Sequence, residues 1–512
     1  MKYNRIKYCT TLLSILFSLT LFAQIGRDEF TEIHIDSVPH HVQPMTGIVF
    51  WQDQYQNKIQ DATSLEFSYM LFNDVVSEQE VYDWSKVESK LNDIASRHHQ
   101  AIFRFRYVYV GEETSVPDYI KALPDYHETE GISEGETTWF PDWTNQELKD
   151  FTLDFYTHFA QRYDNDPRLA FVEVGFGLWA EYHIYDGPFI LGQTFPSKAF
   201  QESFFNHLDT TFITTPFMIS IDAASDKYSP FAEVPALLDI PFGLFDDSFM
   251  HEGFDEPGEY NTESWNFFGR NRYQVAPAGG EFSYYTSYDQ QHVLDYPDGP
   301  YGKPFEYFAN DFHITFIIGN DQAIYQTPAR IKQASMAAGY LFKITSFLSK
   351  QDSSIVTVKN VGVAPFYYDA YVTVDGIRST VSLKHLLPGD SLVCPVSAGG
   401  SQPALTIESD RLVEGQAIEY LGTENHLGII NRNKNSGFII YPNPVEKGNP
   451  VYLKASDNKI KTYSMMSLTG QIVDSGSFYR QISINTTALK TGLYIVTVNN
   501  GEASFSRKVI VK

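Results

Sequence analysis

Two glutamates stand in segments of small residues where a carboxylate could act on a bound molecule. Glu181 ends the segment GFGLWAE at residues 175–181, and Glu281 ends the segment PAGGE at residues 277–281. Small residues let the backbone approach a ligand closely before the acidic side chain is presented. Two carboxyl groups that flank a glycosidic bond can hydrolyse it, because one protonates the leaving oxygen while the other attacks the sugar or activates water. Glu181 and Glu281 are therefore the predicted catalytic pair.

Other residues near the predicted strand ends are candidates for binding the same ligand. Flat aromatic side chains could stack on the apolar faces of sugar rings, and Arg106 could orient a carboxylate or bind a hydroxyl or anionic group. The alternative for each acid is a solvated loop position, and for each Trp a place in the core. The predicted substrate-binding residues are Arg106, Trp143, Trp179, His183, Asp222, Asp246 and Tyr284.

A further carboxylate, Glu173, has a predicted structural role. Strand alternation places Phe171, Glu173 and Gly175 on one face and apolar residues on the other, so Glu173 should point into a barrel together with Arg104. A buried carboxylate needs a partner. We therefore expect an internal ion pair between Glu173 and Arg104.

Several other chemistries lack support in the sequence. The chain has no Gly-x-Ser-x-Gly segment, and Cys394 lies in a predicted β-domain. Histidine pairs occur at residues 40–41 and 98–99, beside polar segments, and no further His, Asp or Glu spacing completes a metal site. Neither a metal nor another cofactor is therefore expected. The formal charge of −25 argues against nucleic acid as a partner.

The elements that position these residues follow a β/α pattern. Amphipathic helical segments fall between several apolar runs, and eight such repeats within residues 25–350 predict a (βα)8 TIM-like barrel, whose reactive groups lie at the carboxyl ends of the strands. A doubly wound open sheet is the alternative, but no Gly-rich phosphate-binding segment follows the first strand. The predicted strands are residues 46–51, 65–72, 101–107, 170–176, 217–222, 242–246, 274–278 and 313–318.

The rest of the chain predicts smaller units. Short strands with Asp-Gly and Pro-Gly turns predict an immunoglobulin-like β-sandwich at residues 351–424, a polar linker follows at 425–436, and more short strands form a second β-sandwich at 437–512. At the N-terminus, cations precede an uncharged run at residues 10–23, which predicts a signal peptide over residues 1–24. No later run has transmembrane length.

The tail resembles the C-terminal sorting domain of the type IX secretion system of Bacteroidetes. The resemblance rests on Tyr-Pro-Asn-Pro at 441–444, Thr-Gly at 469–470, Gly-Leu-Tyr at 492–494 and the basic, apolar terminus at 508–512. It implies type IX machinery as a partner, and a protein secreted or attached at the outer membrane surface after signal peptide cleavage.

The barrel and first sandwich resemble a Bacteroidetes family of unknown function, DUF4832-like, with a glycosidase-like barrel. The residues are Gly-x-Trp-x-Glu-x-His at 177–183, Pro-x-Gly-Gly-Glu at 277–281 and the segment NVGVAPF at 360–366. Glutamates after strands four and seven are also similar to the acid/base and nucleophile of retaining glycosidase barrels, although Ala180 stands where an Asn commonly precedes the first glutamate.

Three functions remain open from the sequence. The first is hydrolysis of an extracellular poly- or oligosaccharide, with Glu181 as general acid/base and Glu281 as nucleophile or base. The second is glycan binding without catalysis on the same barrel. The third is a structural or adhesive surface protein, for which no deep pocket at the barrel rim is expected.

Overall fold

The computed structural model describes residues 30–53, 61–319, 321–423, 438–455, 460–467, 471–499 and 504–512. The predicted signal peptide at 1–24 and the predicted linker at 425–436 lie outside these ranges. The described residues fall into two compact units, one before and one after residue 427. The first unit holds all the candidate site residues.

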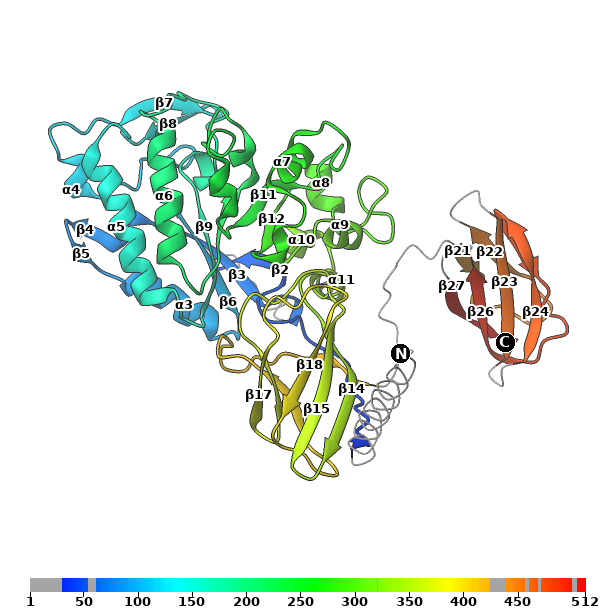
Figure 1. Cartoon of the computed structure of the whole chain (residues 1–512). Helices are drawn as coiled ribbons and strands as arrows, with labels where there is room; N and C mark the ends of the chain where they lie inside the picture. Colours follow the sequence, from blue (N-terminus) through cyan, green and yellow to red (C-terminus); the bar gives the residue numbers. More distant parts are fainter. Residues whose placement is uncertain are drawn as a thin grey trace, which may run out of the picture. The chain divides into compact units, whose positions relative to one another are not determined.

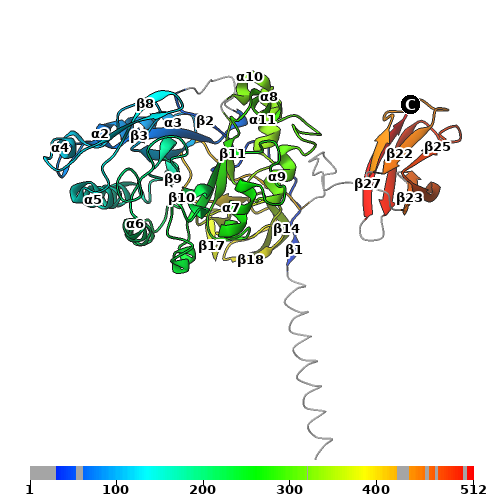
Figure 2. The ribbon, with the colours of Figure 1, turned by 90° about the horizontal axis from the view of Figure 1, so that it is seen from above.

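The first unit contains a closed barrel of eight strands, each parallel to its neighbours (Figures 1 and 2). This confirms the predicted TIM-like barrel. Parallel strands need crossover connections, which supply the outer helices and put every strand's carboxyl end on one rim. In chain order the barrel strands are β2 (Gly47–Trp51), β3 (Leu65–Leu71), β6 (Gln100–Arg106), β9 (Leu169–Val174), β10 (Phe217–Ser220), β11 (Gly243–Phe249), β12 (Ala278–Phe282) and β13 (Phe316–Ile318).

The seventh strand lies later in the chain than predicted. Part of the predicted run forms a 3-10 turn, η5 (Arg272–Gln274), and β12 begins only at Ala278. The strand contains Gly279 and Gly280, and glycine disfavours strands, so the pattern pointed to the apolar residues before it. Glu281 is consequently part of the strand rather than of the loop that follows it.

Helices surround the barrel, and α5 (Gln146–Tyr163) illustrates how they pack. Its Phe155 and Phe159 contact Phe105 on the outer face of β6, with ring centroids 4.7 and 5.3 Å apart. No helix in the described ranges is long and apolar enough to cross a membrane. The other helices are α2 (Phe72–Val75), α3 (Ser85–Ala95), α4 (Asp118–Lys121), α6 (Lys198–Thr211), α7 (Tyr260–Phe268), α8 (Ser287–His292), α9 (Phe305–Asp311), α10 (Gln322–Tyr325) and α11 (Pro328–Ser335).

A β-sandwich closes the amino-terminal end of the barrel, which we call the floor. Its sheets have the orders β1-β14-β15-β18, with β20 paired to β14, and β17-β16-β19. The strand β14 starts before the predicted boundary at residue 351. The strands are β1 (Thr31–Glu32), β14 (Phe342–Lys350), β15 (Ser353–Asn360), β16 (Tyr371–Val374), β17 (Ile377–Ser382), β18 (Ser391–Val396), β19 (Leu405–Glu408) and β20 (Tyr420–Leu421).

The floor and the sandwich share one apolar core. Phe171 of β9, Phe316 of β13 and Tyr368 of the sandwich belong to a single buried cluster. Arg411 then donates from Nη2 to the Leu169 carbonyl at 2.6 Å. Because the core is continuous, the sandwich and barrel form one folded body.

The second unit is another small β-sandwich, as predicted for the tail. Its sheets have the orders β21-β22-β25 and β24-β23-β26-β27, and they enclose a separate apolar core that includes Phe438, Met465 and Val496. The strands are β21 (Phe438–Tyr441), β22 (Val451–Ala455), β23 (Ile460–Ser467), β24 (Ile472–Tyr479), β25 (Gln481–Ile484), β26 (Gly492–Asn499) and β27 (Ser504–Val511).

Candidate active site

The loop after β9 folds tightly back on itself and so presents Glu181 at the carboxyl end of the barrel, which we call the mouth. Glu181 O accepts from the Gly177 amide at 2.8 Å, and His183 O accepts from the Leu178 amide at 3.0 Å. A Cβ on Gly177 would lie 1.9 Å from His183 O, so only glycine fits there. Trp179 and Ala180 adopt positive φ angles of 59° and 57°. Such strained backbone is typical of functional sites.

Arg104 on β6 is the central cation of this mouth. Its Nη2 lies 2.7 Å from Glu173 Oε2, and both side chains are buried, which confirms the predicted internal ion pair. Its Nη1 lies 3.5 Å from Glu181 Oε1, and its Nη2 lies 3.5 Å from Asp247 Oδ1. Arg104 also donates to the Trp179 carbonyl at 3.2 Å, so it holds the strained loop in place.

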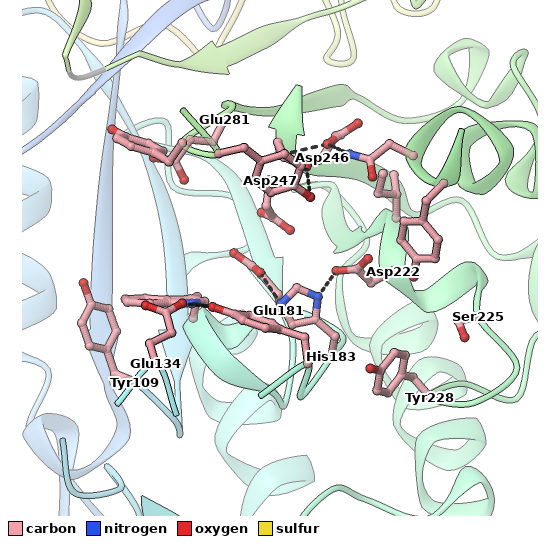
Figure 3. A pocket seen from close by; sticks show the side chains of 18 of the residues that line it. Tyr109, Glu134, Glu181, His183, Asp222, Ser225, Tyr228, Asp246, Asp247 and Glu281 are labelled. Carbon is pink, nitrogen blue, oxygen red and sulfur yellow. Dashed lines mark hydrogen bonds and ion pairs between the residues drawn. The ribbon is translucent and has the colours of Figure 1, made fainter. Parts of the chain in front are cut away.

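His183 lies between two carboxylates, as Figure 3 shows. Its Nε2 is 3.0 Å from Glu181 Oε2, and its Nδ1 contacts the Asp222 carboxylate. Burial opposes protonation of the imidazole, but Asp222 and Glu181 outweigh it and raise the pKa of His183 well above its usual value. Burial likewise opposes ionisation of Asp222, but His183 outweighs it and lowers the pKa of that carboxyl. His183 is therefore an imidazolium that is paired with Glu181, and it is not free to bind substrate.

Two adjacent aspartates at the end of β11 have different surroundings. Asp246 is fully buried and accepts from Asn261 Nδ2 at 2.7 Å and from Trp265 Nε1 at 2.8 Å. Burial raises the pKa of Asp246 to about 7. The next residue, Asp247, accepts from Ser220 Oγ at 3.1 Å and contacts Arg104. Burial, reinforced by the nearby Glu181, raises the pKa of Asp247 well above its usual value.

Glu281 enters the site from β12. A Cβ on the preceding Gly280 would lie 2.1 Å from the Asp246 carbonyl oxygen, so glycine allows β11 and β12 to approach closely here. The Glu281 carboxyl receives no hydrogen bond from the residues that the structure describes. Burial raises its pKa to about 8, Arg104 opposes that shift, and Glu181 adds to it. Glu281 is therefore largely protonated at neutral pH.

These groups line a pocket of about 1030 Å³ at the mouth of the barrel. Aromatic side chains make up much of its wall, and Tyr284 and Tyr285 are 49% and 69% exposed. The lining includes seven carboxyl-bearing residues and two basic ones. The acids are Glu134, Glu181, Asp222, Asp246, Asp247, Glu281 and Asp321, and the bases are His183 and Lys227.

Of the predicted substrate-binding residues, Trp179, His183, Asp222, Asp246 and Tyr284 line this pocket. The stacking role predicted for Trp143 is wrong. Trp143 is fully buried and packs against Tyr107 and Phe176, with ring centroids 5.4 and 5.1 Å apart, so no sugar can reach it.

Arg106 also lies outside the pocket lining. Its Nη2 donates to Glu112 at 2.7 Å, and its guanidinium lies 4.2 Å from the ring centroid of Tyr109. Tyr109 does line the pocket and contacts Trp179 edge to face, with ring centroids 4.5 Å apart. Arg106 thus supports an aromatic wall, and the prediction of direct substrate contact by Arg106 is not met in this arrangement.

Several lining residues were not singled out from the sequence. Glu134 comes from the tip of a hairpin formed by β7 (Thr129–Ser133) and β8 (Glu136–Phe140), and it accepts a hydrogen bond from Tyr185 OH. Tyr185 in turn accepts from Trp179 Nε1 at 3.3 Å. No local motif marks such positions, because the path of each loop decides which side chain reaches the pocket. The others missed include Trp51, Tyr69, Tyr109 and Tyr260.

Glu181, His183 and Asp222 lie close enough together to hold a metal ion, with ligand atoms within 4.8 Å of one another. In this arrangement each imidazole nitrogen faces a carboxylate. A metal would have to replace the imidazolium proton, whose presence the two carboxylates favour. The three residues therefore fit an ion-paired cluster better than a metal site.

Comparison with known proteins supports the sorting function of the tail. Residues 439–512 match a protein family described as the secretion system C-terminal sorting domain. This match supports the predicted type IX secretion tail and implies a secreted or cell-surface protein. No curated protein sequence matches the chain.

Solved structures with some similarity are glycosidases, but only distantly. The catalytic domain of β-amylase from Paenibacillus polymyxa has 8% identity and a TM-score of 0.35, covering 57% of this chain and 99% of its own. A family 39 glycoside hydrolase from Bacteroides cellulosilyticus WH2 has 11% identity and a TM-score of 0.35, with coverages of 70% and 83%. The GH36 α-galactosidase AgaA from Geobacillus stearothermophilus has 11% identity and a TM-score of 0.28, with coverages of 69% and 55%. Because these scores are low, the barrel is assigned from its strand pairing. Any reaction has to be inferred from the residues of the pocket.

Proposed function

We propose that this chain is an exported glycoside hydrolase that cleaves a poly- or oligosaccharide in the pocket at the barrel mouth. The observation that carries the proposal is the contrast between two carboxyl groups of one pocket. Burial keeps Glu281 largely protonated at neutral pH, whereas Glu181 adjoins the cations of Arg104 and His183. Two titratable groups whose environments differ in this way can divide the work of acid and base.

The contrast assigns Glu281 as the general acid, with Glu181 as the nucleophile or base. This exchanges the two roles expected from strand order. Glu281 donates its proton to the glycosidic oxygen as the bond from that oxygen to the anomeric carbon breaks. Glu181 either attacks the anomeric carbon, to form an ester that is hydrolysed by a water whose proton passes back to Glu281, or removes a proton from a water that attacks the anomeric carbon directly.

The proposal is tested by replacing each carboxyl group with an amide. Glu281→Gln and Glu181→Gln should each lower kcat on a natural glycan by about 10²–10⁴-fold, because an amide neither donates that proton nor attacks. A dinitrophenyl glycoside needs no protonation of its leaving group. Glu281→Gln should therefore retain most of its activity on that substrate, while Glu181→Gln should not.

Glu130→Gln is the matched control, since Glu130 is exposed and lies outside the pocket lining. Full activity of both pocket variants would refute the assignment. Tight glycan binding without turnover by the unaltered protein would instead favour a non-catalytic glycan-binding protein.

The proposal includes export through the type IX machinery, with residues 1–24 as the signal peptide and 437–512 as the sorting tail. The tail has its own apolar core, so the remaining chain should fold without it. In a host that has this secretion system, a chain lacking 437–512 should accumulate, folded, in the periplasm. Its appearance at the cell surface or in the medium would contradict this role of the tail.

A further inference from the structure

We infer that the pocket takes a glycan whose sugar rings carry protonated amino groups. This inference rests on the proposed function and narrows its substrate class. Its starting point is the charge of the pocket, in which seven carboxyl-bearing residues accompany only His183 and Lys227 among the described lining residues. These acids surround a cavity large enough for several sugar rings, rather than forming an isolated surface cluster.

Two of the three cations near the pocket are already paired with carboxylates of the protein. Arg104 is paired with Glu173 at 2.7 Å, and His183 lies between Glu181 and Asp222. Lys227 donates to Tyr228 OH at 3.0 Å, and its ammonium lies over the rings of Phe189 and Tyr228. Among the described lining residues, only the exposed Lys227 could pair with a uronic acid or sulfated sugar, and such a ligand would also meet the seven carboxyl-bearing residues. Like charges at such an interface disfavour binding.

Two of the carboxyl groups, those of Glu281 and Asp247, are by contrast left short of positive charge. The Glu281 carboxyl receives no hydrogen bond from the described part of the chain, and Asp247 shares the one guanidinium of Arg104 with Glu173 and Glu181. Burial raises the pKa of Glu281 to about 8 and the pKa of Asp247 well above its usual value. A ligand that supplied positive charge beside Asp247 would lower the pKa of that carboxyl and release its proton, while Glu281 keeps the proton that it donates in catalysis.

An ammonium group fits this deficiency better than a hydroxyl. It carries three N–H donors and no acceptor, so it can satisfy several carboxylate oxygens at once, while a hydroxyl donates only once. The pocket wall adds the faces of Trp179, Tyr109 and Tyr284, which suit both sugar rings and cations. Charge, hydrogen bonding and wall composition thus favour the same kind of ligand.

The direct test compares oligomers that differ only in charge. The full-length Glu181→Gln variant, which should not turn over substrate, is titrated calorimetrically with glucosamine and galactosamine hexamers, with their N-acetylated counterparts and with galacturonate hexamer. A hydrogen bond to a charged group contributes about 1.5–3 kcal/mol, so at neutral pH one of the amino hexamers should bind at least about tenfold more tightly than its acetylated counterpart. The galacturonate hexamer should bind most weakly. Equal or tighter binding of the acetylated or acidic hexamers would overturn the inference.

A second measurement locates the effect in the pocket. Binding of the amino hexamer at pH 7.5 should release protons, seen as a dependence of the binding heat on the buffer's ionisation enthalpy. Adding Asp247→Asn should reduce that release, and Asp321→Asn should weaken amino-hexamer binding without weakening acetyl-hexamer binding. Glu130→Gln is again the control. Unchanged proton release and affinity in both pocket variants would count against the inference.

The inference and the proposed function fail in different ways. Hydrolysis of a neutral glycan at the same rate as an amino glycan would refute the preference for amino groups and leave the hydrolase proposal standing. Tight, selective binding of amino hexamers that the unaltered protein never cleaves would support the preference and refute hydrolysis.

Discussion

The two ends of the barrel are formed by the same eight strands but by opposite kinds of side chain. At the floor, Phe171 stacks on Phe316 with ring centroids 5.4 Å apart, and the apolar core continues into the sandwich. At the mouth, two residues further along the same face of β9, Glu173 begins a network of buried charges. The floor therefore stabilises the fold through apolar packing. At the mouth, carboxyl groups take the place of such packing.

The pair formed by Arg104 and Glu173 is the boundary between these ends. Both residues lie on strands that are apolar at the floor. The Arg104 guanidinium contacts Glu173 and also Glu181 and Asp247 at the mouth. Substitutions on either side of this boundary should therefore separate stability from activity.

A large effect on stability is expected at the boundary itself. Glu173→Ala should lower the free energy of unfolding by about 3–5 kcal/mol, because it leaves the buried Arg104 without its main partner. Denaturant unfolding monitored by circular dichroism measures this change.

A double variant sharpens the result. Arg104→Met with Glu173→Leu replaces both charges by apolar groups and should recover much of the lost stability. It should not recover activity, since Arg104 also contacts Glu181. A melting temperature that is unchanged in Glu173→Ala would mean that the pair contributes nothing to stability.

A smaller effect, dependent on pH, is expected at Glu281. Its folded pKa of about 8 lies above the usual value for glutamate, so the folded protein binds this proton more tightly than the unfolded chain. The stability contributed by this group is complete below the unfolded pKa and is lost as the pH rises toward 8. Glu281→Gln removes that loss, so the melting temperature of the variant minus that of the unaltered protein should increase from about pH 4.5 to 8. A difference that stays constant with pH, or falls, would contradict the assigned burial of Glu281.

The floor was easier to predict from the sequence than the mouth. Alternation along residues 169–174 placed Phe171 and Glu173 inside the barrel, because side-chain direction in a strand follows from sequence spacing alone. The same rule paired Glu173 with Arg104, and the structure confirms that contact. It failed for the seventh strand, where two glycines weaken the pattern.

The mouth depends on loop paths, which no periodic pattern encodes. Glu181 and Asp222 could be found because they follow strands closely in the sequence. Tyr109 and Tyr185 reach the pocket from loops, while Trp143, in a similar loop, packs beneath it. The ion pairs of His183 were also not predictable, because they require Glu181 and Asp222, from two different loops, to contact one imidazole.

The smallest effect on activity, and the most direct comparison of the two ends, comes from truncating one aromatic residue at each. Trp179→Ala should raise KM, or weaken glycan binding, by about tenfold with little change in kcat, because it removes a contact made equally by substrate and transition state. Its melting temperature should change little, since Trp179 lines the pocket at the mouth. Phe171→Ala should do the reverse, lowering the free energy of unfolding by about 3–5 kcal/mol while KM stays the same. Isothermal titration and thermal melting of both variants give the four values needed. If Trp179→Ala destabilised the fold as much as Phe171→Ala, the strained loop after β9 would be part of the barrel's packing, and the division of the barrel into a stabilising floor and a binding mouth would be wrong.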